Sequence, residues 1–352
     1  CVLITGAGGT IGSELVRQIA MLSPAKIVLV DASEMNLYNI DQTLAMMKDV
    51  SFRAYLGDVR DEAHMEEIFA AERPQIILHA AALKHVPLME ANPIATVMTN
   101  VGGTKIIIDL ARQYNAESFT LISTDKAVSP NNIMGASKRI AEMMTLATTG
   151  GSQDMSTSAV RFGNVLASNG SVIPLFEKQI EAGGPVTVTD KNVTRYFMTK
   201  EEAGALVLQA AALNAEHSKQ TAAIYVLDMG DPVNITRLAR QLIRLRGLIP
   251  GEDIKITYTG LRPGEKLEEV LTSEDELLES TYVKGIDKFT DTASDNKGGD
   301  QKLLGQKIDR LLAAGQKRDR GQMTKALAAL IPSFKPNGGL TKNPPQKPAV
   351  KS

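Results

Sequence analysis

Short apolar runs alternate with longer amphipathic segments over the first 165 residues of the chain. The runs cover residues 1–5, 26–30, 51–56, 75–80, 117–123 and 156–162. Continuous apolar strands that are separated by helices indicate a parallel sheet covered on both faces. The pattern therefore predicts an α/β fold built on a doubly wound parallel sheet, in which ligands bind at the carboxyl ends of the strands.

The rhythm becomes less regular after residue 165. Helical patterns near 172–182, 200–215 and 234–246 surround one more core strand, 223–229, and two late helices are expected at about 301–314 and 318–330. We predict a first domain at 1–170, to which the 223–229 strand returns, and a smaller C-terminal substrate-binding lobe at 171–330. Residues 331–352 are rich in Pro, Gly and Lys, and we predict that this tail is disordered.

Charge and composition narrow the class of ligand. The 39 Lys and Arg residues nearly balance the 40 Asp and Glu residues, and no extended basic run occurs. Electrostatics therefore favours no nucleic-acid partner, and a small molecule is the better expectation. Cys1 is the only cysteine and the four histidines are scattered, so we predict no disulfide and no metal site.

The lengths of the apolar segments and the start of the sequence indicate where the protein would be located. No run of about 18 apolar residues is present to span a bilayer, and no signal peptide is recognised. The sequence starts abruptly inside the first predicted core strand, so we expect a piece of a longer protein. We predict a domain on the cytoplasmic side, with any membrane contact made through a preceding region.

A glycine-rich turn follows the first predicted strand. Gly6, Gly9 and Gly12 form a GxxGxxG pattern that stands directly before a helix starting near Thr10 and Ile11. Such glycines let the backbone approach a pyrophosphate closely, and the helix N-terminus offers N–H donors to it. The context of strand, turn and helix predicts a Rossmann-like dinucleotide site in the first domain.

An acidic residue ends the second predicted strand. Asp31 stands 19 residues after Gly12, where a carboxylate can accept hydrogen bonds from both adenosine ribose hydroxyls and repel a 2′-phosphate. This favours NAD over NADP as cofactor. The alternative is that Asp31 serves as a helix cap with help from Ser33, which is otherwise a further cofactor candidate.

The next two strand ends add cofactor candidates. Asp58 and Val59 follow the third strand, where the adenine would reach, and Ala80, Ala81 and Ala82 follow the fourth. Tight packing of a helix on the sheet would explain the alanines equally well. Their position at the carboxyl edge favours the cofactor.

Reactive side chains follow the fifth predicted strand. Thr124, Asp125 and Lys126 lie at the same edge of the sheet, and Met134 and Lys138 stand four apart at the start of the next helix, so they share one face of it. Neighbouring acid and base groups suit proton transfer. The alternative is an Asp–Lys pair in a solvated loop, which is the commoner fate of neighbouring charges.

At this point a resemblance becomes plain. The chain resembles the extended short-chain dehydrogenases/reductases and, within them, the nucleotide-sugar 4,6-dehydratases of polysaccharide biosynthesis. The segments that carry it are TGAGGTIGSELVRQI, HAAALKHVPLMEANP, STDKAVSPNNIMGASKRIAE, VRFGNVLASNGSVIPLF, VTRYFMT and TGLRPGEKLEEVL, which cover roughly residues 1–272. Met134 departs from the YxxxK pattern of the wider superfamily, and a subgroup with an amino-terminal membrane region is similar in this respect.

The resemblance implies an activity. UDP-N-acetylglucosamine would be oxidised at C4, would lose water across C5 and C6, and would regain hydride at C6, giving UDP-4-keto-6-deoxy-N-acetylglucosamine. The Met variant is more similar to the group that retains the C5 configuration, with a C5-inverting dehydratase as the first alternative. A UDP-sugar 4-epimerase and a non-catalytic NAD-binding module are further alternatives; the first needs the tyrosine, and the second would explain its loss.

Two adjacent groups of opposite character suit the elimination. We assign Asp125 as the acid at O6, which requires a protonated carboxyl, and Lys126 as the base at C5, which requires a neutral amine. We expect Lys138 to hold the nicotinamide ribose, and a water ordered by Thr124, Asp125 or Lys138 to receive the 4-hydroxyl proton. Met134 transfers no proton and is expected to pack.

The resemblance also implies substrate residues. Asn164 and the arginines Arg195 and Arg262 would bind the diphosphate, a task that suits a guanidinium fork. Glu265 would accept from the nucleotide ribose. Lys84 and His85 would lie near the sugar or its N-acetyl group. Helices near 93–114 and 134–148 resemble the pair that forms a dimer in this superfamily, so we expect a homodimer or a larger homo-oligomer.

Overall fold

A computed structural model describes residues 1–147, 155–166, 168, 170–216, 222–273, 276–290 and 299–334 of the chain. Within these residues, nine strands form one sheet in the order β14-β15-β11-β6-β5-β4-β1-β2-β3. Its strands are β1 (Val2–Thr5), β2 (Ile27–Asp31), β3 (Phe52–Leu56), β4 (Ile76–His79), β5 (Ser118–Ile122), β6 (Ser156–Arg161), β11 (Ala222–Leu227), β14 (Leu277–Ser280) and β15 (Ile286–Thr290).

The strands from β3 to β11 run parallel, and β15 and β14 continue the sheet antiparallel. The order reverses between β1 and β4, as in a doubly wound sheet. Each of the six predicted apolar runs became one strand, and the predicted strand 223–229 returns to the sheet as β11 beside β6. The α/β prediction is confirmed.

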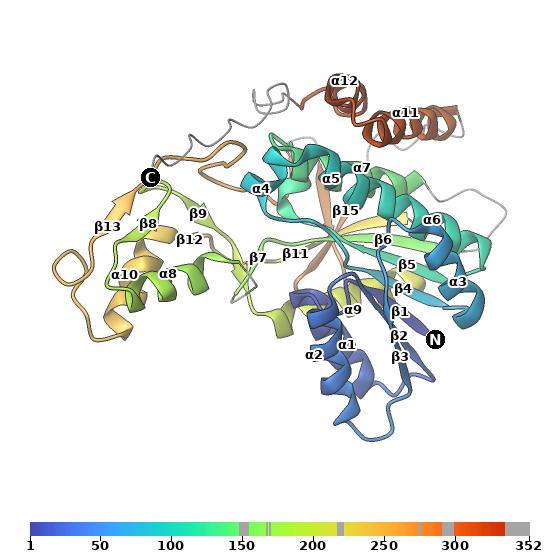
Figure 1. Ribbon diagram of the computed structural model, residues 1–352, viewed down its shortest axis with the longest axis horizontal. Helices are drawn as coiled ribbons and strands as arrows, with labels where there is room; N and C mark the ends of the chain where they lie inside the picture. Colours follow the sequence, from blue (N-terminus) through green and yellow to red (C-terminus); the bar gives the residue numbers. More distant parts are fainter. Residues whose placement is uncertain are drawn as a thin grey trace, which may run out of the picture.

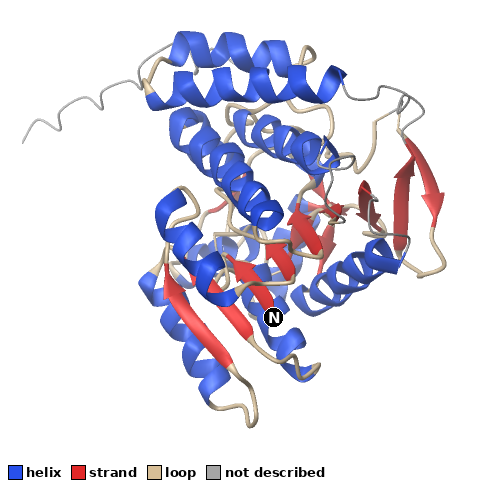
Figure 2. Ribbon diagram, turned by 90° about the vertical axis from the view of Figure 1, so that its right-hand side faces the viewer, coloured by secondary structure: helices blue, strands red, loops and turns tan. Residues whose placement is uncertain are grey.

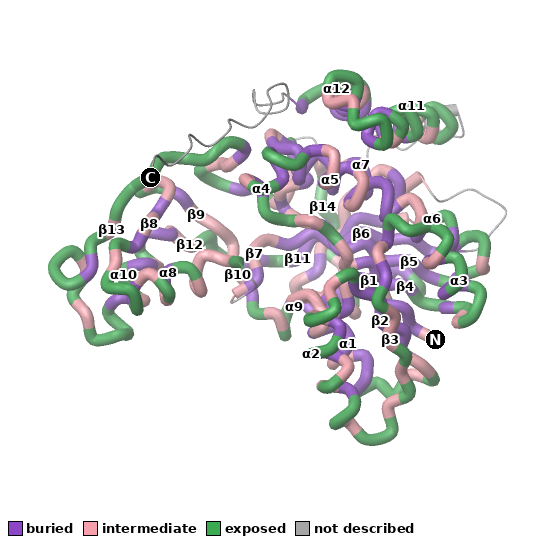
Figure 3. Tube along the Cα trace, in the orientation of Figure 1, coloured by how far each residue is buried: buried purple, intermediate pink, exposed green. Residues whose placement is uncertain are grey.

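Helices cover both faces of the sheet (Figures 1 and 2). One face packs on α1 (Thr10–Met21), α2 (Glu34–Ala45) and α9 (Lys200–Glu216), and the other on α3 (Glu62–Glu72), α4 (Val86–Ala91), α5 (Pro93–Val97), α6 (Thr104–Gln113) and α7 (Ile133–Ala147). A π-helical turn, Met98–Gly103, joins α5 to α6. Figure 3 shows the central strands buried between these layers, which explains why they are apolar at consecutive positions.

A separate cluster of apolar side chains forms the core of the lobe. It joins α8 (Val172–Glu181) and α10 (Ile235–Leu245) to β8 (Val186–Val188) and β13 (Ile256–Tyr258), which pair in parallel. Two short strand pairs border it: β7 (Asn164–Val165) pairs with β10 (Phe197–Met198), and β9 (Thr194–Arg195) pairs with β12 (Val233–Asn234). Asn234 caps α10, because its side chain accepts a hydrogen bond from the Arg237 N–H.

The last two helices do not belong to this lobe. In the structure, α11 (Gly299–Gln316) and α12 (Arg320–Leu330) lie side by side over the helices of the sheet (Figure 2). Ile308, Leu311 and Leu327 join the same apolar cluster as α6 and α7, not that of α8 and α10. The prediction of one lobe at 171–330 therefore stays a proposal, and the packing favours a smaller lobe at about 172–197 and 233–258.

The same helices change the expectation for a dimer. The Leu312 side chain lies 3.4 Å from where a Cβ on Gly102 would stand. The Met98 sulfur lies 2.8 Å from where a Cβ on Gly315 would stand. Helix α11 thus lies over the helical pair that was predicted to meet a second copy. Because that face is covered within the chain, a dimer through it would require α11 to move, so the proposed oligomer needs another surface or this displacement.

The predicted disordered tail begins too early. Ile331 and Phe334 are buried and pack in the cluster with α12, because the apolar side chains past its end still reach the core. Residues 335–352 lie outside the described part of the chain.

One described helical stretch is long and apolar enough to cross a membrane by length and composition. It is Pro93–Gln113, which comprises α5, the π-helical turn and α6, and it has a mean hydropathy of 1.2 over its apolar window. The fold buries 61% of that window. This is the burial of a core helix, so the stretch is weak evidence for a membrane span.

Candidate active site

The glycine turn after β1 leaves no room for side chains. Gly6 has a positive φ of 64°, and a Cβ on it would come within 2.7 Å of the Ala81 nitrogen. A Cβ on Gly12 would lie 2.0 Å from the Gly6 carbonyl oxygen. Helix α1 begins at Thr10, and no side chain caps it at Gly9. The turn therefore presents bare backbone and a helix N-terminus at the carboxyl edge of the sheet.

Asp31 is held at this turn by backbone donors. The Gly8 N–H donates to Oδ2 and the Ser33 N–H donates to Oδ1, each at 2.9 Å. Ser33, not Asp31, caps α2, because its hydroxyl accepts from the Asn36 N–H at 3.3 Å. The alternative that Asp31 is the helix cap is thus wrong, and its carboxylate is aimed across the glycine turn.

The remaining cofactor candidates lie at the same edge with different surroundings. Asp58 accepts from the Arg60 side chain and from its N–H at 2.9 Å, and these bonds lower the pKa of Asp58. Val59 is buried against Gly103, whereas Ala82 is exposed beyond the end of β4. The Asp58 carboxylate is therefore hydrogen-bonded to Arg60, and Val59 chiefly packs against Gly103.

The predicted catalytic residues come together after β5. Thr124 precedes the 3₁₀ turn Asp125–Ala127 and donates from its hydroxyl to Asp125 Oδ1 at 2.8 Å. The Lys126 ammonium donates to the same oxygen at 3.0 Å and to Asn164 Oδ1 at 3.4 Å. Asp125 is 1% exposed, so the pair does not lie in a solvated loop. The acid, the amine and the Asn164 amide form one cluster between β5 and β6.

A second carboxylate, absent from the predicted set, joins this cluster. Glu269 comes from the segment after Glu265, and its Oε1 lies 3.8 Å from the Lys126 ammonium. Burial raises the pKa of Glu269. The sequence offered one signal, the run EKLEE in the arginine motif, but nothing in it shows which of the acids points inward.

Met134 and Lys138 occupy the first turns of α7, as predicted. Met134 is 3% exposed and packs in the apolar cluster, so its thioether fills space. Lys138 is buried, and burial lowers its pKa to about 8.

His79, at the end of β4, is fully buried between the hydroxyls of Thr5 at 2.7 Å and Thr104 at 3.0 Å, and burial lowers its pKa to about 3. His79 is therefore a neutral structural link beneath the turn.

The two arginines predicted to bind the diphosphate are both tied to the segment 262–267. The Arg195 guanidinium donates to the carbonyl of Lys266 at 2.9 Å and to that of Leu267 at 3.0 Å. Arg262 pairs with Glu265, with Nε donating to Oε1 at 3.0 Å. These bonds hold the segment 262–267 beside the lobe. Binding of a diphosphate by Arg262 would require it to leave Glu265 or to share it.

The two predicted sugar-contacting residues stand at the start of α4. Lys84 and His85 are exposed. The His85 ring lies 2.5 Å from the position of a Cβ on Gly170, whose positive φ of 72° already favours glycine. The ring thus bridges from the end of β4 to the loop after β6, on the side where Asn164 lies.

A buried ion network supports the cluster from below. Arg161, at the end of β6, is 0% exposed and donates to Glu142 of α7 at 2.8 Å and to Glu276 at 2.7 Å. The Ser123 hydroxyl, one residue before Thr124, donates to Glu142 at 2.6 Å. The network therefore joins β5, β6 and α7, the three elements that carry the candidate catalytic residues.

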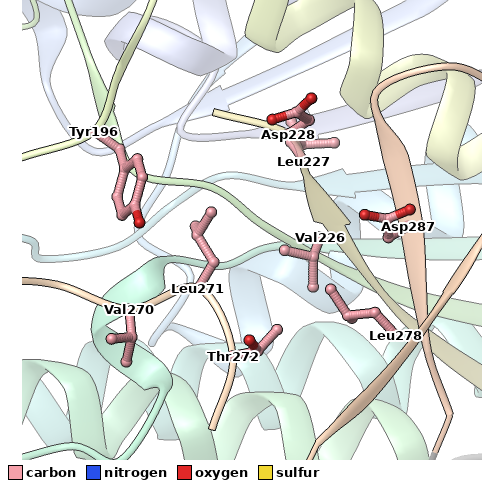
Figure 4. Close-up of a pocket in the computed structure, with 9 residues that line it drawn as sticks. All are labelled: Tyr196, Val226, Leu227, Asp228, Val270, Leu271, Thr272, Leu278 and Asp287. Carbon is pink, nitrogen blue, oxygen red and sulfur yellow. The ribbon is translucent and has the colours of Figure 1, made fainter. Parts of the chain in front are cut away.

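A pocket of about 340 Å³ lies next to this site but outside it (Figure 4). It opens between the end of β11, the strands β14 and β15, and the residues Val270–Thr272. Its lining consists of Tyr196, Val226, Leu227, Asp228, Val270, Leu271, Thr272, Leu278 and Asp287. None of the predicted site residues is among these, so the candidate active site rests on the cluster around Lys126.

Fold and site together define an α/β protein of the doubly wound class, with a glycine turn of the dinucleotide-binding type. The chain belongs to the family described as polysaccharide biosynthesis protein, whose model matches residues 2–290. The capsular polysaccharide biosynthesis protein CapD of Staphylococcus aureus is 46% identical over 301 residues, which cover 84% of this chain and 49% of CapD. The chain thus spans about half the length of that relative.

More distant relatives are enzymes with named activities. A UDP-N-acetylglucosamine 4,6-dehydratase (inverting) of Campylobacter jejuni is 30% identical over 78% of each chain. A UDP-glucose 4-epimerase of Rickettsia akari is 31% identical over 80% of each chain. Among solved structures, Pen from Bacillus thuringiensis matches with a TM-score of 0.74 and 29% identity, covering 88% of this chain and 97% of that one. The chain is therefore similar to proteins of more than one sugar-nucleotide activity.

Proposed function

We propose that the chain is an NAD-dependent UDP-N-acetylglucosamine 4,6-dehydratase, a hydro-lyase that forms UDP-4-keto-6-deoxy-N-acetylglucosamine with retention at C5. The observation that carries the proposal is the buried contact of 3.0 Å between the Lys126 ammonium and Asp125, in a chain where Met134 replaces a phenol. An acid and an amine side by side suit removal of water. The dehydratase relative supports the reaction class.

The glycine turn fits the dinucleotide. A pyrophosphate needs bare backbone at a helix N-terminus, which Gly6, Gly9 and Gly12 supply, and a ribose diol needs an acceptor such as Asp31. Lys138 lies one turn beyond Met134, where it would hold the second ribose. Bound NAD would supply a reversible acceptor for the C4 hydride.

Side chains of the protein would carry out the proton transfers and bind the substrate. Thr124 and Asp125 would order the water that takes the 4-hydroxyl proton, Lys126 would take the C5 proton, and Asp125 would protonate the leaving 6-hydroxyl. Asn164, Arg195 and Arg262 would hold the diphosphate, with Glu265 released to the ribose. Lys84 and His85 would border the sugar.

The cofactor proposal predicts the effect of filling the turn. Gly12→Ala places a methyl group 2.0 Å from the Gly6 carbonyl, and only backbone movement relieves it. Because such overpacking costs about 1–3 kcal/mol, we expect NAD affinity to fall by about tenfold or more. Calorimetric titration with NAD measures this. Gly305→Ala, which meets no atom within 4 Å on α11, is the control, and equal affinities in both variants would contradict the placement.

The activity itself is tested by product analysis. We expect proton NMR of a reaction with UDP-N-acetylglucosamine in heavy water to show a new C6 methyl signal and deuterium at C5, whose coupling constants report retention or inversion. Conversion to UDP-N-acetylgalactosamine without a methyl signal would instead favour the 4-epimerase, an activity that the Rickettsia relative carries. Unchanged substrate with bound NAD would favour a non-catalytic module.

A further inference from the structure

Two buried carboxylates face a single amine in the candidate active site. The Lys126 ammonium is 3.0 Å from Asp125 Oδ1 and 3.8 Å from Glu269 Oε1. The exposed fractions of the three side chains are 15% for Lys126, 0% for Asp125 and 4% for Glu269. A lone ammonium between two acids carries one positive charge against two potential negative charges. The cluster therefore places a second carboxylate near the one ammonium, beyond the single partner that a simple ion pair needs.

The outer oxygens of both acids have no partner. Asp125 Oδ2 and Glu269 Oε2 are buried and accept no hydrogen bond within the described part of the chain. A purely structural ion pair satisfies its buried oxygens, because each one left unmade costs about 1–3 kcal/mol. Unsatisfied acid oxygens next to a reactive amine are the pattern of a site that exchanges protons.

Glu269 is held in place by the segment that precedes it. The Lys266 ammonium donates to the carbonyls of Val128 at 3.3 Å and Ser129 at 3.0 Å, just after the catalytic turn. Arg195 binds the carbonyls of 266 and 267 from the other side. These bonds fix the backbone just before Glu269 against the loop that carries Lys126, and they thereby keep the Glu269 side chain near the amine.

We propose that Glu269 is the proton partner of Lys126, the group that takes the ammonium proton and leaves the neutral amine required at C5. This inference rests on the proposed dehydratase function. In the step, an N–H bond of Lys126 breaks and an O–H bond of Glu269 forms. The free amine then takes the C5 proton, and the resulting ammonium, whose protons exchange with solvent, later delivers a proton to C5, after which Glu269 gives its own proton back. No oxidant or further reactant is needed.

The surroundings of Glu269 agree with this role. The charged groups that face it are Lys126, Asp125, Arg195 and Lys266. Burial and the Asp125 charge raise its pKa, while the three cations lower it. The 3.8 Å separation exceeds a hydrogen bond, so transfer requires the side chains to close or one water to bridge them.

Glu269→Gln tests the proposal through the pH dependence of kcat. In the wild type, the exchange is internal and kcat stays level around neutral pH. In the variant, Lys126 must lose its proton to solvent. We therefore expect kcat to fall by about 10²-fold at neutral pH, to rise about tenfold per pH unit on going alkaline, and to leave KM little changed. Glu269→Asp should restore the level profile in part.

The matched control is Glu268→Gln, because Glu268 is the exposed neighbour in the same segment. We expect it to behave as the wild type. A second readout is C5 deuterium incorporation from heavy water, which should slow in Glu269→Gln in proportion to kcat. Thermal unfolding and NAD binding confirm that each variant is folded.

The outcomes separate the two proposals. If the wild type forms no keto sugar, the proposed function fails. If the wild type forms it and Glu269→Gln matches Glu268→Gln, or loses kcat equally at every pH, this inference alone is overturned. If Glu269→Gln does not fold, Glu269→Asp decides. A wild-type rate of C5 exchange in Glu269→Asp would mean that the carboxylate is only structural, and it would overturn the inference.

Discussion

Replacing Lys126 by methionine is expected to lower kcat by about 10²–10⁴-fold, the usual contribution of one general base. Methionine keeps the length and apolar stem of the side chain but cannot take the C5 proton. The change also leaves Asp125, which is 1% exposed, without its ammonium donor, so some loss of stability accompanies the loss of rate. KM should change little, because the diphosphate is assigned to other residues.

The measurement is product formation together with C5 deuterium incorporation in heavy water. Both should fall in step, because the same proton transfer controls them. Lys255→Met, at an exposed lysine of the lobe, is the matched control and should retain wild-type rates. If Lys126→Met were to retain C5 exchange at the wild-type rate, another base would have to be sought, and Glu269 would be the first candidate.

The sheet was predictable because burial on two faces leaves a simple mark. The positions of β2 from Ile27 to Val30 are all buried, and a strand segment buried on both faces must be apolar at consecutive positions. The edge strands had no such mark. The residues Leu277–Ser280 of β14 are exposed throughout, so neither alternation nor continuity signals a strand. Local pattern predicts an element well only where the tertiary structure buries it in a regular way.

The placement of α11 shows a different limit. Its apolar positions, such as Ile308 and Leu311, announce a helix with one face to bury, and the helix was predicted. The surface on which that apolar face packs depends on contacts between residues far apart in the sequence. The helical pattern itself does not specify that surface. The prediction therefore assigned the helix to the lobe and left the α6–α7 face free for a second copy, whereas the chain covers that face itself.

The candidate site divides in the same way. Thr124, Asp125 and Lys126 could be placed because the end of a predicted parallel strand fixes where they lie. Glu269 lies in an irregular segment, where no periodicity distinguishes an inward acid from the exposed Glu268 beside it. The mutual pairing of Arg262 and Glu265 was also beyond reach, since it depends on side-chain geometry within one loop.

The buried network behind the site carries the second large prediction. Arg161→Met is expected to destabilise the fold by about 3–5 kcal/mol, the usual cost of removing one partner from a buried ion pair. Arg161 bridges Glu142 and Glu276 with four hydrogen bonds of 2.7–3.0 Å. Removing it leaves Glu142 with the partly exposed Arg139 and the Ser123 hydroxyl as its donors.

The pH dependence of this loss identifies its cause. In the wild type, Arg161 and Arg139 hold the pKa of Glu142 below its usual value despite burial, so the stability from this group is present above the unfolded-state pKa and is lost as pH falls through the folded one. Without Arg161, burial dominates and the folded state prefers the protonated acid. The variant should therefore be most destabilised at neutral pH and less so near pH ~5.

Urea unfolding at both pH values measures the loss of stability. Arg240→Met, at an exposed arginine, is the control, and we expect its stability to lie within about 0.5 kcal/mol of the wild type. A loss that is equal at both pH values would mean that packing of the Arg161 stem, and not its charge, stabilises the junction of β6 and α7.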